Sequence, residues 1–204
     1  MKKIVVLLFL LLLSSCEKSN FCSEIIKGKP DNHLINDSDL QTVKSLFESN
    51  NLSLNNFLVY RLQIDDMGYK HVKCYQYVNN LKVFTDEVIF HFDAQNHYYV
   101  LSGELISTIN IKTSPSMSKN DVIKIFLKSV EDDDSDFSPN LEQLKDGCFL
   151  CELGYYDLNS GTSYASQNFI RAWKITPEDK DFPVAFINDS DKSLIYYFNG
   201  VIID

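Results

Sequence analysis

The chain has 204 residues, enough for one or two compact domains, and a formal net charge of −9 at pH 7. Its 19 lysine and arginine residues against 28 aspartate and glutamate residues argue against nucleic acid as a partner, because phosphates are bound by basic side chains. The same balance argues against a polybasic surface that binds lipid headgroups. Any contact with a membrane therefore has to come from another feature of the sequence.

The N-terminus has the pattern of an export signal. Lys2 and Lys3 precede an unbroken apolar run from Ile4 to Leu13, and Leu-Ser-Ser-Cys then ends at Cys16. An apolar run of about ten residues is typical of a secretory signal, whereas a bilayer span needs about twenty. Leu-Ser-Ser-Cys also resembles a bacterial lipobox, which would make Cys16 the lipidated first residue of the mature protein. We expect residues 1–15 to be a signal peptide; an ordinary signal peptide cleaved nearby is the alternative.

One helix and four strands are predicted for the first half of the chain. Residues 16–31 are polar and unpatterned, which predicts a lipidated tether. Ser38 and Gln41 have the spacing of a capping box, so a helix is expected to begin at Ser38 and to end near Asn50. Alternating apolar residues predict strands over residues 57–64, 69–78, 81–93 and 97–111. Together these elements predict an α+β module over residues 32–112.

The same order of elements restarts after residue 112. Ser118 and Asp121 mark the start of a second helix. The acidic run 131–136 is expected to be an exposed loop, with calcium binding as the alternative. Strands are expected over residues 148–158, 168–176, 182–188 and 194–203. The predicted fold class is therefore α+β, with residues 113–204 as the second of two tandem modules, each one helix packed on an antiparallel sheet.

The cysteines beyond Cys16 are even in number, which favours disulfides in an exported protein: Cys22, Cys74, Cys148 and Cys151. Four thiols allow three pairings, and the sequence leaves the choice open. Cys148 and Cys151 are expected in one strand, where residues three apart point to opposite faces about 10 Å from each other, too far for a disulfide. Redox chemistry and a four-cysteine zinc site remain alternatives to structural cysteines.

Both predicted modules resemble known ones. The propeptide module of fungalysin and thermolysin-like metallopeptidases is similar to Tyr75 to Phe84, Val88 to Asp93 and Leu101 to Ile106. A PepSY module is similar to Ser116 to Val122, Arg171 to Ile175, Phe186 to Asn188 and Asn199 to Ile202. The resemblance covers most of residues 35–204. It implies a pair of cystatin-like α+β folds, which in the family fold and inhibit the attached protease.

The chain also differs from the members of that family. In the family a zinc peptidase domain with His-Glu-x-x-His follows, and none of the four histidines here begins that motif. We therefore expect a stand-alone lipoprotein without the peptidase domain, with no enzymatic activity, no cofactor and no catalytic or metal-binding residues. His91, Asp93 and His97 surround one hairpin and could hold a metal, but a solvated hairpin end also accounts for them.

The residues with the strongest signal for binding are two adjacent tyrosine pairs in predicted strands: Tyr155, Tyr156, Tyr196 and Tyr197. One member of each pair must face outward, and exposed tyrosines are typical of protein-binding surfaces. We predict a non-catalytic lipoprotein, anchored through Cys16 in the cell envelope and facing the periplasm or the exterior. A secreted metallopeptidase, inhibited or chaperoned, is the partner that the resemblance implies. A structural or assembly protein of the envelope and a propeptide relic are the alternatives.

Overall fold

A computed structural model of the protein describes residues 22–162 and 166–202. The predicted signal peptide, Cys16 and the start of the predicted tether lie outside this range. Its elements in chain order are β1 (Ser23–Ile26), α1 (Asp37–Ser49), β2 (Phe57–Ile64), β3 (Lys70–Val78), β4 (Leu81–Phe92), β5 (Tyr98–Ser102), α2 (Lys119–Glu131), α3 (Leu141–Lys145), β6 (Phe149–Asp157), β7 (Phe169–Pro177), β8 (Val184–Asn188) and β9 (Leu194–Phe198). None of the helices in the described residues has the length and apolar character that a membrane span requires.

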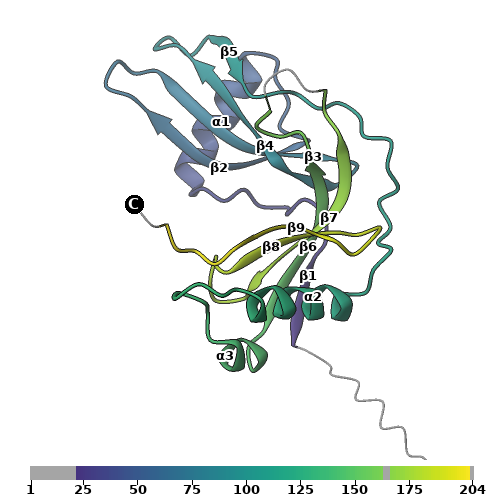
Figure 1. The fold of residues 1–204 in the computed structure, drawn as a ribbon. Helices are drawn as coiled ribbons and strands as arrows, with labels where there is room; N and C mark the ends of the chain where they lie inside the picture. The colour runs from purple at the N-terminus through teal and green to yellow at the C-terminus, as the bar shows by residue number, and fades with distance from the viewer. Residues whose placement is uncertain (1–21, 163–165, 203–204) are drawn as a thin grey trace, which may run out of the picture.

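All of these strands join in one sheet with the order β2-β3-β4-β6-β7-β8-β9, while β1 pairs with β6 and β5 pairs with β4 (Figure 1). Most pairs are antiparallel, but β4 and β1 both run parallel to β6. The β4–β6 pairing, in which Val83 lies opposite Tyr155, joins the two halves of the chain. The fold is thus mixed α and β with a core made mostly of sheet, and the sheet continues across the boundary predicted after residue 112.

The segment that was predicted to be a tether contributes a strand. Ser23–Ile26 pair with Phe149 to Glu152 of β6, and Ile25 packs against the hydrophobic core. A disulfide between Cys22 and Cys148 holds the start of this strand, with the Cα atoms 4.6 Å apart. Ile25 and Ile26 stand alone among polar residues, so the sequence of this segment does not predict a strand. Its strand conformation depends on backbone pairing with β6, which is distant in sequence.

Two hydrophobic clusters lie between helices and sheet, one for each half of the chain. α1 packs on β2, β3 and β4 through Val43, Leu46 and Phe47, and this helix begins after Asn36, whose Oδ1 accepts a hydrogen bond from the Asp39 amide at 2.9 Å. The predicted cap at Ser38 was therefore two residues late. α2 and α3 pack on β4 and on β6 to β8, and Ser118 caps α2 as expected. Figure 1 shows α1 against the upper part of the sheet and α2 and α3 against the lower part.

Both clusters lie on the same face of the sheet. Val72 and Cys74 of β3 belong to the α1 cluster and Val78 to the α2 cluster, and side chains two and four residues apart in a strand share a face. The connector between the halves crosses this face as well. Its predicted strand over 97–111 ends at Ser102, because Gly103 has a φ of +89° and a Cβ there would meet a backbone oxygen of β4. We call this face, which all three helices contact, the helical face.

A buried ion pair fixes the connector to the second half. Asp189 is 0% and Arg171 8% exposed, and Oδ2 of Asp189 accepts a hydrogen bond from Nε of Arg171 at 2.7 Å. The same carboxylate accepts from Nε1 of Trp173 at 2.7 Å and from the backbone amides of Ser116 and Met117. Burial raises the pKa of Asp189, but these donors outweigh it, so the pKa lies below its usual range. The carboxylate therefore stays charged and holds the start of α2 on the sheet.

Candidate partner-binding face

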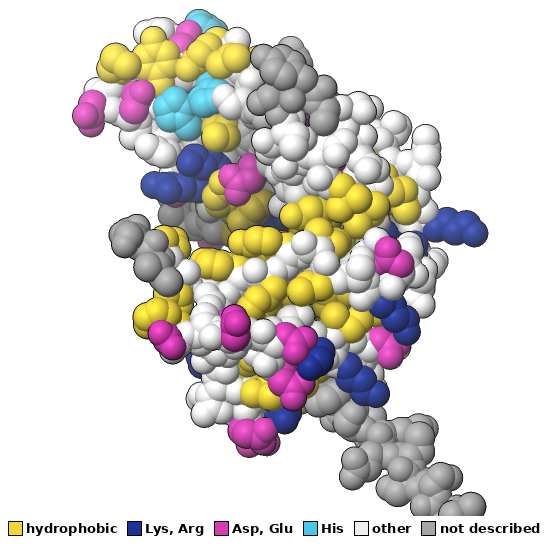
Figure 2. Space-filling view, viewed as in Figure 1, with side chains coloured by type: hydrophobic (Ala, Val, Ile, Leu, Met, Phe, Trp, Pro, Cys, Tyr) yellow, Lys and Arg dark blue, Asp and Glu magenta, His cyan; other side chains and the backbone are white. Residues whose placement is uncertain are grey.

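The face of the sheet opposite the helices, which we call the open face, is covered by none of the helices in the described residues. Alternation places residues of β4, β6, β7, β8 and β9 on it in register: Lys82, Phe84, Gly154, Tyr156, Ala172, Lys174, Phe186 and Tyr196. Figure 2 shows hydrophobic side chains gathered in a band across the middle of the molecule, at the height of β8 and β9 in Figure 1. The exposed Tyr196 and half-buried aromatic side chains next to charges make this face the candidate functional surface.

Four aromatic side chains form a row across this face. The ring of Phe186 lies 5.2 Å from that of Tyr156, 5.3 Å from that of Phe84 and 6.3 Å from that of Tyr196. Gly154 makes room for the row, because a Cβ at this position would lie 2.6 Å from the Phe84 ring and 2.5 Å from the backbone oxygen of Lys82. We call these four residues the aromatic row. Aromatic side chains that are held by their neighbours lose little freedom on binding and suit protein contacts.

The four predicted tyrosines divide between the two faces. Tyr156 and Tyr196 belong to the aromatic row, and Tyr196 is 46% exposed. Tyr155 is fully buried on the helical face, where its hydroxyl lies 3.4 Å from the carbonyl oxygen of Ile111, so its prediction as a binding residue was wrong. Tyr197 faces α2 and donates a hydrogen bond to Asp133 at 3.3 Å. Because side chains alternate between the two faces of a strand, the sequence predicts that two adjacent tyrosines point to opposite faces. It does not predict which of the two points outward.

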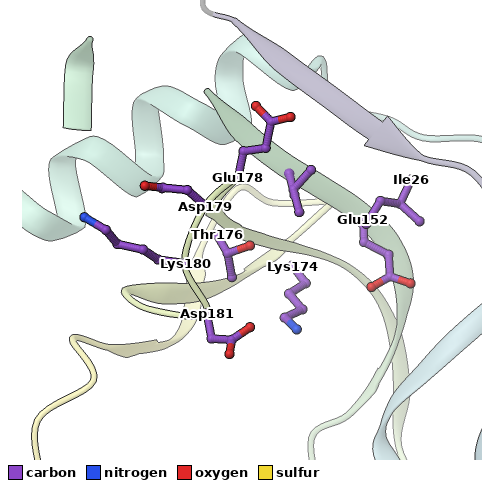
Figure 3. A pocket seen from close by; sticks show the side chains of 9 residues that line it. Ile26, Glu152, Lys174, Thr176, Glu178, Asp179, Lys180 and Asp181 are labelled. Atoms are coloured by element: carbon purple, nitrogen blue, oxygen red, sulfur yellow. The ribbon is translucent and has the colours of Figure 1, made fainter. Parts of the chain in front are cut away.

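A charged cavity of about 370 Å³ opens beside the row, between β1, β6 and the loop after β7 (Figure 3). Its lining consists of Ile26, Leu150, Glu152, Lys174, Thr176, Glu178, Asp179, Lys180 and Asp181. Glu152 and Lys174 are cross-strand neighbours, and in Figure 3 their side chains extend to the same side of the sheet. We call this group of residues the charged cavity.

Glu152 has an unusual environment for a carboxylate. Burial raises its pKa above the usual range, although the nearby Lys82 and Lys174 act in the opposite direction, and no hydrogen bond contributes to the shift. Burial likewise lowers the pKa of Lys82, whose ammonium lies 3.4 Å from the ring centroid of Tyr75 in a cation–π contact. The open face thus holds a carboxylate with a raised pKa and two cations close to half-buried aromatic rings.

The alternatives of a metal or redox centre based on cysteine do not fit the described residues. Sγ atoms of Cys22 and Cys148 lie within 4.8 Å of a carboxylate oxygen of Glu178, but the two sulfurs are bonded to each other and do not act as thiolate ligands. Cys74 and Cys151 are buried in different clusters. Burial raises the pKa of Cys74 to about 12 and that of Cys151 to about 11, which leaves both thiols protonated and unreactive.

The metal alternative at the hairpin requires His91, Asp93 and His97 to lie together, and the described residues form no such group. Asp93 and His97 contact each other at 3.2 Å at the hairpin end. His91 instead contacts His71 on the neighbouring strand, a residue that sequence reasoning did not connect with it.

Comparison with known proteins finds a match within the first half of the chain. Residues 55–105, which contain β2 to β5, match the family model of the Fungalysin/Thermolysin Propeptide Motif. Bacillolysin of Bacillus amyloliquefaciens is 35% identical to this chain over 68 residues, which are 32% of this chain and 13% of bacillolysin. The propeptide resemblance predicted from the three segments of the first half is thus confirmed. The chain spans a small part of that relative's length, and the PepSY resemblance of the second half stays a prediction.

Proposed function

We propose, from the premise that residues 55–105 form a fungalysin/thermolysin propeptide-like module, that the protein is a non-catalytic binding protein for a metallopeptidase. The matched motif belongs to the propeptide and not to a catalytic domain, which supports a role next to a peptidase. The open face carries the proposal, because it presents the aromatic row and the charged cavity without a covering helix in the described residues.

Binding would use two kinds of contact. The aromatic row offers apolar anchors, of the kind that contributes most of the energy at protein interfaces. Glu152 and Lys174 would select a partner with complementary charges, and a partner cation next to Glu152 would add to the stabilisation that Lys82 and Lys174 give its carboxylate. Any inhibition of the peptidase would be steric, since the contact needs no reaction.

We also propose that the protein acts outside the cytoplasm as a lipoprotein. The signal-like residues 1–15 and the lipobox-like Cys16 support an anchor in the cell envelope, and the Cys22–Cys148 disulfide is the type of bond that persists in an oxidising compartment. Residues 113–204 would form the second, PepSY-like module. Labelling cells with an alkyne fatty acid should mark the wild-type protein and leave a Cys16→Ser variant unmarked.

The binding proposal is tested with the full chain carrying Cys16→Ser, immobilised and exposed to bacillolysin. A Phe186→Ser/Tyr196→Ser variant should lose at least about tenfold in affinity, because it removes two neighbouring anchors. Tyr99→Ser is the matched control, since Tyr99 is a 53% exposed tyrosine on β5, outside the aromatic row. Equal affinities for all three proteins would contradict the proposal. Recovery of an envelope complex instead of a peptidase from solubilised membranes would favour the structural alternative.

A further inference from the structure

His71 and His91 form a cross-strand pair at the end of the sheet far from the second module. They are directly opposite each other on β3 and β4, and their Nδ1 atoms lie 2.7 Å apart. The rings are nearly perpendicular, with centroids 4.9 Å apart and an interplanar angle of 72°. Two imidazole nitrogens therefore converge on one point between the strands.

The outer nitrogens of both rings have partners that orient them. Nε2 of His71 lies 3.6 Å from a carboxylate oxygen of Asp65, and Nε2 of His91 lies 2.8 Å from Oγ of Ser102. Asp65 is itself fixed, because its other oxygen accepts hydrogen bonds from the Met67 and Tyr69 amides at 3.0 and 2.9 Å. A carboxylate near the outer nitrogen of a histidine favours the proton on that nitrogen and leaves a lone pair on the inner nitrogen, as is common for histidines that bind metals.

Only one proton fits between the two Nδ1 atoms. With His71 Nε2 protonated toward Asp65, His91 must supply the Nδ1 proton, and the Ser102 hydroxyl then donates to Nε2 of His91. A metal cation can replace this bridging proton. His91 then carries its proton on Nε2, the Ser102 hydroxyl turns to accept it, and both Nδ1 atoms bind the metal. The exchange moves the His91 proton from Nδ1 to Nε2, so the neutral histidine pair binds one metal ion and releases no proton.

We propose that His71 and His91 bind a late first-row divalent cation, such as Zn²⁺, Ni²⁺ or Cu²⁺, in a two-imidazole site supported by Asp65 and Ser102. Imidazole suits these ions, whereas Ca²⁺ and Mg²⁺ prefer oxygen ligands. The His71 side chain is 22% exposed, so water or a ligand from a partner can complete the coordination. The site lies outside the aromatic row and the charged cavity, and it does not depend on the proposed binding of a peptidase.

The test is calorimetric titration of NiCl₂ and ZnCl₂ into the untagged full chain carrying Cys16→Ser, which removes a competing thiol. We expect one saturable site with no net proton release at about pH 8, where both imidazoles are neutral, so two buffers of different ionisation enthalpy should give the same binding enthalpy. His71→Ala and His91→Ala should abolish it, and Asp65→Asn should weaken it about tenfold or more. His97→Ala is the matched control, since its side chain is 76% exposed at the neighbouring turn, and it should bind as the parent does.

Absence of a saturable site, or a site that survives His71→Ala, would overturn the proposal. A second measurement avoids dependence on the folding of the alanine variants. In NMR spectra of the parent protein, substoichiometric Cu²⁺ should broaden the imidazole signals of His71 and His91 before those of His33 and His97. Broadening that begins at His97 would overturn the proposal as well.

Discussion

One carboxyl group on each face of the sheet has a shifted pKa, and the two pKa values shift in opposite directions. On the helical face Asp189 accepts hydrogen bonds from Arg171 and Trp173 and from two backbone amides, and its pKa is lowered. On the open face Glu152 has a raised pKa, with lysines nearby and no hydrogen bond contributing. Glu152 lies in β6, and Asp189 is bound by Arg171 and Trp173 of the neighbouring β7. The difference indicates that the carboxylate on the helical face stabilises the fold, and it supports the proposal that the open face binds a partner.

Removal of the Asp189 carboxylate should have the largest effect. Asp189→Ala leaves the Arg171 guanidinium buried without its counter-charge and should lower the free energy of unfolding by about 3–5 kcal/mol. Urea unfolding followed by tryptophan fluorescence measures it. Asp191→Ala, at an exposed turn two residues away, should cost less than about 1 kcal/mol. A similar small loss for both variants would remove the contrast between the faces.

The disulfide should rank second. Cys22→Ser/Cys148→Ser releases the start of β1, and because the bond spans 126 residues it should lower the free energy of unfolding by about 2–5 kcal/mol. Thermal unfolding with and without reductant measures the effect. Reductant should lower the midpoint of the wild type to that of the variant and leave the variant itself unchanged. A wild type insensitive to reductant would show that this bond does not support the fold.

Glu152→Gln should have a smaller effect of the opposite sign. Because the folded state raises the pKa of Glu152, its protonated form suits the fold, and the stability present below the unfolded pKa of about 4.5 is lost as the pH rises through the folded pKa. The glutamine variant should therefore be more stable than the wild type at about pH 7, and the gain should vanish below about pH 4. Glu142→Gln, which alters an exposed surface pair, is the control without this gain. A loss of stability in Glu152→Gln would mean that the carboxylate is already well paired.

The aromatic row should contribute least to stability. Tyr196→Ser removes a ring that is 46% exposed and should change the free energy of unfolding by about 0.5 kcal/mol or less, while binding of bacillolysin falls. Measuring both quantities on one preparation separates recognition from folding. A large loss of stability would place Tyr196 with the residues of the helical face instead.

Local patterns predicted most of the elements of this fold, but not β1, α3 or the long-range register of the strands. The helix cap at Ser118 and the strands β2, β3 and β4 follow from residues a few positions apart. The pair of His71 and His91 does not. From the turn at Asn79 and Asn80 a regular hairpin would place Val88 opposite His71, but an irregularity in β4 shifts the register by three residues. No pattern of neighbouring residues in the sequence predicts this shift.

The sequence predicted only part of the candidate site, again because the site depends on elements that are distant in sequence. Adjacent tyrosines predicted that one member of each pair faces outward, yet the helices decide which face is buried, and their position depends on the whole sheet. The sequence did not predict the role of Glu152, because a single glutamate between apolar residues is typical of the solvent-facing side of a half-buried strand. Its burial comes from the neighbouring strands and the loop after β7, which are distant in sequence.

The central claim is that the open face is the surface that binds a peptidase. Hydroxyl-radical footprinting with and without bacillolysin tests it most directly, because it reports the exposure of individual side chains. We predict that bacillolysin protects Tyr156 and Tyr196 from oxidation, while Tyr99 and Met67, which are 53% and 72% exposed on the first half, keep their reactivity. Unchanged oxidation of Tyr156 and Tyr196 in a sample where bacillolysin is bound would contradict the account.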